Sequence, residues 1–173
     1  MDYVYKEVDE SEYDSVCKAV CDKLKFKPSV ADSAAPFEIS EKYTVYDISK
    51  LTNREIDNLD ILMPKVFDRC IRKNEFIYAL DWNHSCFKYN PTKEISPSSE
   101  CITWTSDDEY MGGGYNGYFP NFYPKRGYYF FIVNSFKWGY LAHPWQKKVW
   151  VFGEMLIEKI EKIKRDVGFI RIQ

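Results

Sequence analysis

Histidine is the side chain best suited to acid-base chemistry near neutral pH, and this chain has two, His84 and His143. His143 lies in the segment WGYLAHPWQ (138–146), between two tryptophans. A general base needs a group that orients its second ring nitrogen and a nucleophile within hydrogen-bond reach, and no G-x-S-x-G signature supplies one. A histidine that ends a strand before a proline commonly fixes the turn through its ring nitrogens. The leading interpretation of His143 is a structural corner, with a ligand-binding residue and a catalyst as alternatives.

The second histidine lies in DWNHS (81–85), where Asp81 precedes His84 by three positions. Alternation along an extended strand would place these two side chains on opposite faces, so we expect no cooperation between them. Two histidines could supply only two ligands of a metal site, and carboxylates such as Asp108 would have to complete it. The sequence therefore predicts neither a metal site nor a cofactor.

Tryptophan and histidine together suggest one alternative function. A concave pocket with aromatic walls and an imidazole could bind a sugar or a base, with His143 as acid or base, in a small-ligand-binding protein or an enzyme. The predicted lining residues are Trp82, His84, Trp104, Trp138, His143 and Trp145.

A glycine- and tyrosine-rich segment, SDDEYMGGGYNGYFPNFYP (106–124), suggests the preferred function. Its three successive glycines lack the lysine and the strand-to-helix context of a phosphate-binding loop, so a plain surface loop is the simplest interpretation. Aromatic residues on such a loop are also the types that make contact area at protein interfaces, and the adjoining carboxylates would favour a basic partner. The predicted partner-binding residues are Asp107, Asp108, Glu109, Tyr115, Tyr118, Phe119, Phe122 and Tyr123.

Hydrophobic periodicity predicts the elements that position these residues. Residues 10–27 have helical spacing, and a capping box of Thr52 and Glu55 begins a second helix that Pro64 should kink or split. From residue 75 onward, runs of β-branched and aromatic residues predict strands, followed by a helix that ends near Gly168 and a short last strand. The pattern predicts a single α+β domain over 1–173, with one mostly antiparallel sheet and its helices packed on one face.

Composition narrows the possible partners and compartments. The 173 residues are 45% hydrophobic and carry a net charge of -2, which offers no global positive field for nucleic acid. No run approaches the roughly 18 apolar residues of a membrane span, and the first residues lack the pattern of a signal peptide. Five cysteines without framework spacing are typical of reduced thiols, and the pair Cys17 and Cys21 is expected to pack in the core. We therefore expect a cytoplasmic protein without a membrane or nucleic-acid partner.

The block GYYFFIVNSFKWGYLAHPWQKKVWVFGEML (127–156) resembles a bacterial family catalogued only as domain of unknown function 2716. An aromatic strand, a W-G turn, an H-P-W corner and an F-G before a helix recur there in this order, and YALDWNHSCFKYNP is similar to a further strand. Tyr140 and Ala142 stand where that likeness leads us to expect small or aromatic residues, so the turn geometry is the feature expected to differ. The resemblance covers roughly residues 75–160 and implies a bacterial or phage origin with no established activity. The matching positions are Trp138, Gly139, His143, Pro144, Trp145, Phe152 and Gly153.

These observations favour a non-enzymatic, intracellular interaction module of bacterial or phage type, the class that includes small immunity and inhibitor proteins. The expected partner is a protein, such as a basic toxin or effector, that contacts the aromatic and acidic segment over 106–124. The alternative is the ligand-binding protein or enzyme with the tryptophan- and histidine-lined pocket.

Overall fold

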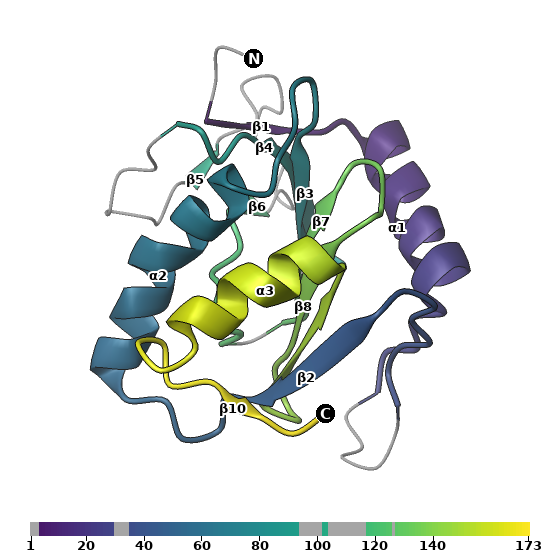
Figure 1. Ribbon diagram of the computed structural model, residues 1–173. Helices are drawn as coiled ribbons and strands as arrows, with labels where there is room; N and C mark the ends of the chain where they lie inside the picture. Colours follow the sequence, from purple (N-terminus) through teal and green to yellow (C-terminus); the bar gives the residue numbers. More distant parts are fainter. Residues whose placement is uncertain (1–3, 30–34, 94–101, 104–116, 126) are drawn as a thin grey trace.

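The computed structural model describes residues 4–29, 35–93, 102–103, 117–125 and 127–173. Its centre is an eight-stranded sheet in which every neighbouring pair of strands is antiparallel (Figure 1). From one edge to the other, the strands are β1 (Tyr5–Glu7), β4 (Ser85–Tyr89), β3 (Ile77–Asp81), β7 (Tyr129–Val133), β8 (Gly139–His143), β9 (Lys148–Phe152), β2 (Tyr43–Asp47) and β10 (Ile170–Arg171).

Two helices cover one face of this sheet. The first is α2 (Asn53–Asp68), which begins at the predicted capping box and continues through Pro64 without splitting. The second is α3 (Glu154–Ile163), which follows Gly153 directly. Both helices bury their apolar stripes in one cluster with the sheet, and Phe67 of α2 is fully buried there.

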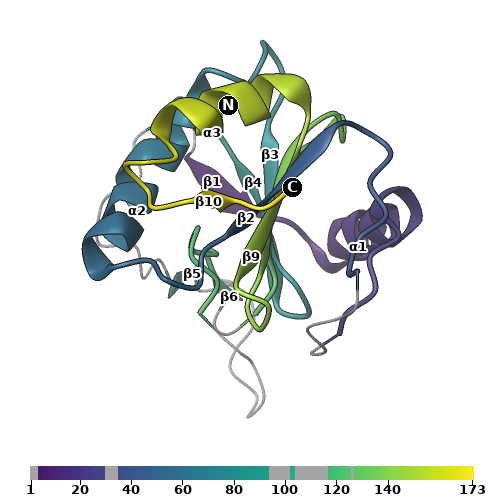
Figure 2. The same cartoon turned by 60° about the horizontal axis from the view of Figure 1, so that its bottom comes forward.

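The third helix, α1 (Glu10–Leu24), covers the opposite face, as Figures 1 and 2 show. Its buried residues Val16, Val20 and Leu24 pack against the sheet in a second cluster. Glu12 fixes the helix in place, because it accepts a hydrogen bond from the Tyr78 hydroxyl at 3.2 Å and forms an ion pair with Lys88 at 2.7 Å.

The α+β class and the single antiparallel sheet are confirmed, but the helices lie on both faces and not only on one. The central strands explain the difference, because all five residues of β7 and of β8 are buried. In β7, Phe131 belongs to the cluster with α2 and α3, whereas Phe130 belongs to the cluster with α1. A sheet that is apolar on both sides needs cover on both sides.

A separate two-stranded sheet pairs β5 (Ile102–Thr103) with β6 (Gly117–Tyr118). These strands flank most of the segment that we expect to bind a partner. Residue 119 follows β6 directly, and from there the chain enters the core beneath α2. The base of the predicted binding segment is therefore anchored to the main sheet.

Candidate functional site

Four ring-bearing side chains gather at one end of the sheet on the face that α1 covers. The register pairs Asp81 with Tyr129, and Tyr129 with Ala142. The neighbouring positions toward the same end of the sheet are Trp82, Tyr128 and His143, which therefore lie in one row across three strands. The N–H of the residue after Asp81 donates to the carbonyl of the residue before Tyr129 at 3.0 Å, which continues that row. We call this group the aromatic corner, and it consists of Trp82, Tyr128, His143 and Trp145.

His143 is the buried centre of the aromatic corner. Its side chain has no exposed surface, and its Nδ1 accepts the backbone N–H of Gln146 at 3.2 Å. The Tyr128 ring lies edge-on to the imidazole, with centroids 4.8 Å apart. An imidazole that closes a turn with one nitrogen has the arrangement that the structural interpretation predicts. In this conformation His143 presents no surface at which it could act as a general base.

Trp145 is the exposed member of the aromatic corner. Its residue surface is 47% exposed, yet its ring lies 5.1 Å from Tyr128 and 5.9 Å from His143 in edge-on contacts. Tyr128 is itself held in place, because its hydroxyl accepts the N–H of Ser29 at 2.7 Å and donates to the carbonyl of the same residue at 2.8 Å. Trp145 therefore offers a large amphipathic ring to the outside on a fixed support.

Trp82 is the member of the aromatic corner that continues its packing into the core. Its ring lies 4.7 Å from Phe26, and the ring of Phe26 lies 5.0 Å from Tyr128. Phe26 follows α1 directly and also stacks on Phe37 at 5.1 Å. The chain that follows α1 thus supports the corner from the side opposite the sheet.

Asp81 and His84 form a hydrogen-bonded pair beside this corner. Asp81 Oδ1 lies 3.0 Å from His84 Nδ1, with the carboxylate side chain 13% exposed and the imidazole 58% exposed. Our expectation that the two side chains do not cooperate is wrong, because Asn83 adopts φ 68° and turns the chain back. Burial raises the pKa of the Asp81 carboxyl, and the hydrogen bond with His84 opposes that effect. The pair has the geometry in which a carboxylate orients an imidazole.

Gly127 leaves the space that this carboxylate occupies. A Cβ at Gly127 would lie 2.9 Å from Asp81 Oδ1, closer than real contacts of this kind. The absence of a side chain at this position lets the chain that leads into β7 pass directly beside the pair.

The predicted tryptophan and histidine pocket does not assemble as expected. Trp82, His84, His143 and Trp145 all lie at one end of the sheet, whereas Trp138 precedes β8 at its other end, about 16 Å away at the usual rise per residue. Trp138 also lies on the opposite face, buried against Phe67 at 5.5 Å. Trp104 lies outside the described residues. The odd separation of Trp138 and His143 along the chain already indicates opposite faces, but β8 is buried throughout, so no polar alternation shows which residue takes which face.

The predicted partner-binding residues are also divided. Phe119 and Phe122 are buried in the cluster beneath α2, so the expectation that their rings face a partner is corrected. Phe122 stacks on Phe131 with centroids 4.6 Å apart, and its carbonyl accepts the Tyr140 hydroxyl at 2.7 Å. The backbone of Tyr118 lies in β6. The remaining acidic and aromatic members, Asp107, Asp108, Glu109 and Tyr115, lie outside the described residues.

Tyr123 connects this segment to the aromatic corner. Lys147, two residues after Trp145, places its Nζ 5.1 Å from the centroid of the Tyr123 ring. The same Nζ donates to the carbonyl of Pro124 at 3.3 Å. The end of the predicted partner-binding segment therefore contacts the turn that carries Trp145.

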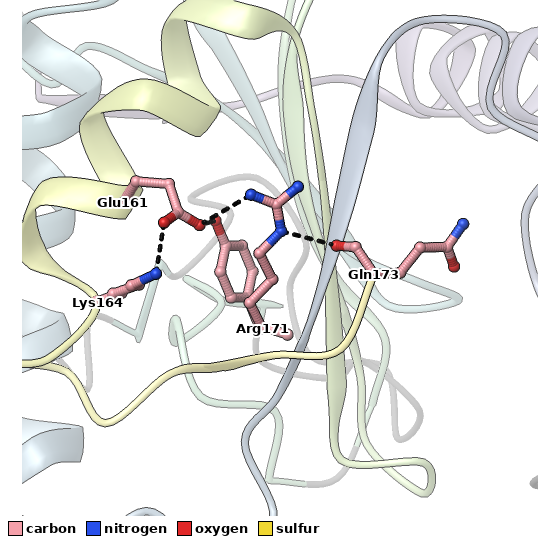
Figure 3. Close-up of polar contacts among 5 residues, drawn as sticks. Glu161, Lys164, Arg171 and Gln173 are labelled. Carbon is pink, nitrogen blue, oxygen red and sulfur yellow. Dashed lines mark hydrogen bonds and ion pairs between the residues drawn. The ribbon is translucent and has the colours of Figure 1, made fainter.

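A polar cluster that no sequence pattern indicated lies near β2 and β10, at the edge of the sheet opposite β1. Glu161 of α3 accepts the Tyr46 hydroxyl at 2.7 Å and Lys164 Nζ at 2.6 Å, and Arg171 lies 3.8 Å away (Figure 3). Burial and the neighbouring Glu161 raise the pKa of Tyr46. Burial opposes ionisation of Glu161, but the hydrogen bonds from Lys164 and Tyr46 outweigh it and lower the carboxyl pKa. This cluster ties α3 and β10 to β2, which is a structural role.

Two further features are absent from the described ranges, a metal-binding group and a membrane-spanning helix. Those residues contain no group of three or more histidine, cysteine or carboxylate side chains placed to hold a metal ion. Across the same part of the chain, no helix has both the length and the apolar character needed to cross a membrane.

An α+β protein whose H-P-W residues form part of an aromatic corner matches the resemblance noted in the sequence, and the comparison with known families agrees. The chain belongs to the family described as protein of unknown function (DUF2716), whose sequence model matches residues 7–157. It is also similar to "Uncharacterized protein YxiI" of Bacillus subtilis (strain 168), with 28% identity over 167 residues that cover 91% of this chain and 92% of that protein. No solved structure matches the chain.

Proposed function

We propose that this protein is a protein-interaction module of the bacterial immunity or inhibitor class, and that its partner contacts Trp145 and the segment over residues 106–118. One observation carries the proposal: Trp145 is 47% exposed while its ring rests on the fixed ring of Tyr128. A half-exposed tryptophan is among the residues most enriched at the energetic centres of interfaces. Because the ring is already held, binding would cost little conformational entropy.

The expected charge of the partner follows from the acidic residues near the start of the segment over 106–118. The net charge of -2 and the run Asp107, Asp108, Glu109 favour a basic toxin or effector. Lys147, two residues after Trp145, places a cation beside the aromatic corner, where it donates to the Pro124 carbonyl and contacts the Tyr123 ring. The preference for a basic partner therefore depends on residues 107–109, and the affinity depends on Trp145.

A cytoplasmic location is part of this proposal. The four cysteines in the described residues are free thiols. Burial raises the pKa of Cys70 to about 11, so this thiol is protonated and unreactive at neutral pH. Unpaired, unreactive thiols are typical of proteins that act in a reducing compartment.

The test is direct binding to a defined candidate, the product of the gene next to this one, which the proposal requires to be a basic protein. Titration calorimetry of the purified pair should show saturable binding that Trp145→Ala weakens by at least about tenfold. Ile61→Ala is the matched control, since Ile61 on α2 is 56% exposed, and it should bind as the parent protein does. Equal affinities of the two variants would remove Trp145 from the interface.

A second test separates the charge contribution from the aromatic one. Replacing Asp107, Asp108 and Glu109 with their amides should slow association, more strongly at low salt, and should leave dissociation nearly unchanged. An affinity that is insensitive to both salt and this triple change would contradict the preference for a basic partner.

The hydrogen-bonded pair of Asp81 and His84 favours one second candidate, a small-ligand-binding protein or enzyme that uses His84. The separation of 3.0 Å and the 58% exposed imidazole fit a base oriented by a carboxylate. Any turnover found for the protein should be lost in His84→Gln and Asp81→Asn, with folding unchanged. Turnover that persists in both variants would exclude this use of the pair.

A further inference from the structure

The last strand of the sheet carries exposed isoleucines on an open edge. Among the described residues, β10 is the final strand in the order of the sheet and pairs with β2 alone (Figure 2). Ile170 and Ile172 are each 51% exposed, and they provide two of the four large hydrophobic side chains that are exposed in the described residues. Because they are two positions apart on extended backbone, they project from the same face. Edge strands with exposed apolar residues are pairing sites unless they are protected.

The backbone of β10 is also oriented for pairing. In an antiparallel ladder, successive residues alternately direct their N–H and C=O groups toward one neighbouring strand and toward the other. Ile172 donates its N–H to the Val45 carbonyl of β2 at 2.9 Å. The N–H and C=O groups of Arg171 therefore point away from β2, toward the open edge.

We propose that β10 pairs antiparallel with β10 of a second copy of this chain, with the two-fold axis at Arg171. In this register the Arg171 backbones exchange two hydrogen bonds, and Ile170 of each copy lies opposite Ile172 of the other. Four isoleucine side chains then cover one another on one face of the joined sheet. A self-complementary register of this kind is what a two-fold interface requires.

The charges on the other face suit the same arrangement. Arg171 points toward α3, where its guanidinium lies 3.8 Å from Glu161, as Figure 3 shows. Two copies would bring together two Arg171 cations. Each arginine keeps beside it the Glu161 carboxylate that it shares with Lys164, which reduces the repulsion across the axis.

This surface is separate from the one proposed for the partner, which lies around Trp145. A strand this short makes a small interface, so we expect a reversible, concentration-dependent dimer and not a permanent one. The proposal thus stands or fails independently of the proposed function.

Sedimentation equilibrium of the full chain tests the association. The parent protein should show a monomer-dimer equilibrium between about 10 µM and 1 mM, and Ile170→Lys with Ile172→Lys should weaken it by at least about tenfold. Ile61→Lys, which adds the same charge at a similarly exposed isoleucine on α2, should dimerise as the parent protein does. A parent protein that stays monomeric over this range would overturn the proposal.

Disulfide trapping tests the register without depending on charge. In the proposed pairing, Ile170→Cys with Ile172→Cys places cysteines of the two copies opposite each other in non-hydrogen-bonded positions, where side chains are closest. Oxidation should give a reducible covalent dimer that neither the parent protein, with its own exposed Cys21, nor Ile61→Cys forms. A dimer that sediments normally but resists this trapping would show that the copies meet elsewhere.

Discussion

The ring of Trp145 lies 5.1 Å from the ring of Tyr128, and the Tyr128 hydroxyl makes hydrogen bonds of 2.7 and 2.8 Å with the backbone of Ser29. An exposed side chain is thus supported by a ring that the chain after α1 holds in place. Tyr128→Phe removes both hydrogen bonds and should lower the free energy of unfolding by about 1–2 kcal/mol. Urea denaturation measures this loss, and it should be accompanied by greater mobility of Trp145 in fluorescence anisotropy.

The buried turn at His143 makes a second prediction. His143→Leu removes the acceptor for the Gln146 N–H in a fully buried site and should cost about 2–3 kcal/mol of stability. His143→Asn can return an acceptor close to the position of Nδ1, so its loss should be smaller. Thermal unfolding of the two variants compares them, and equal losses would indicate that ring packing and not the hydrogen bond is the main contribution.

The glycine before α3 gives the most severe expected substitution. Gly153 has φ 90°, and a Cβ there would lie 2.4 Å from the Cβ of Trp138. Gly153→Ala should therefore destabilise the protein by about 3 kcal/mol or more, through both backbone strain and overlap. Gly127→Ala, where the nearest atom is a carboxylate oxygen of Asp81 that can move, should cost about 1 kcal/mol. Denaturant midpoints of the two variants should differ in this order.

The polar cluster at Glu161 predicts a pH dependence. The pKa of Glu161 in the folded protein lies below its ordinary value of 4.5, so its contribution is complete above that value and is lost as pH falls through the folded pKa. At pH 7, Glu161→Gln should lower the free energy of unfolding by about 1 kcal/mol, because a neutral amide interacts less with Lys164 and Arg171. This difference should shrink as pH falls below about 4.5. A difference that stays constant with pH would contradict the charged role of Glu161.

Much of the fold could be predicted from local sequence. The capping box of Thr52 and Glu55 begins α2 where it was expected, and the predicted last strand is β10. Helical spacing predicted α1 to within a few residues, since it ends at Leu24 and the expected end was residue 27. These features depend on neighbours in the chain, which is the information that periodicity and capping use.

The face of the sheet that a side chain takes, and contacts between residues far apart in the chain, could not be predicted from local sequence in the same way. Trp138 and His143 lie on opposite faces, as a separation of five residues along a strand indicates, but a strand buried on both sides carries no polar alternation to show which face each one takes. The hydrogen bond between Tyr46 and Glu161 joins residues 115 positions apart. A usable signal existed for the turn at Asn83, because asparagine tolerates positive φ and can reverse a chain between Asp81 and His84.

Photo-crosslinking in bacterial cells tests the central claim, that Trp145 is a contact residue, most directly. A photoreactive phenylalanine analogue at position 145 should give a specific covalent adduct with one partner protein, which the proposal expects to be basic and encoded by an adjacent gene. The same analogue at position 61, which is also exposed, should give none. Crosslinking to that protein from position 61 but not from position 145 would contradict the account.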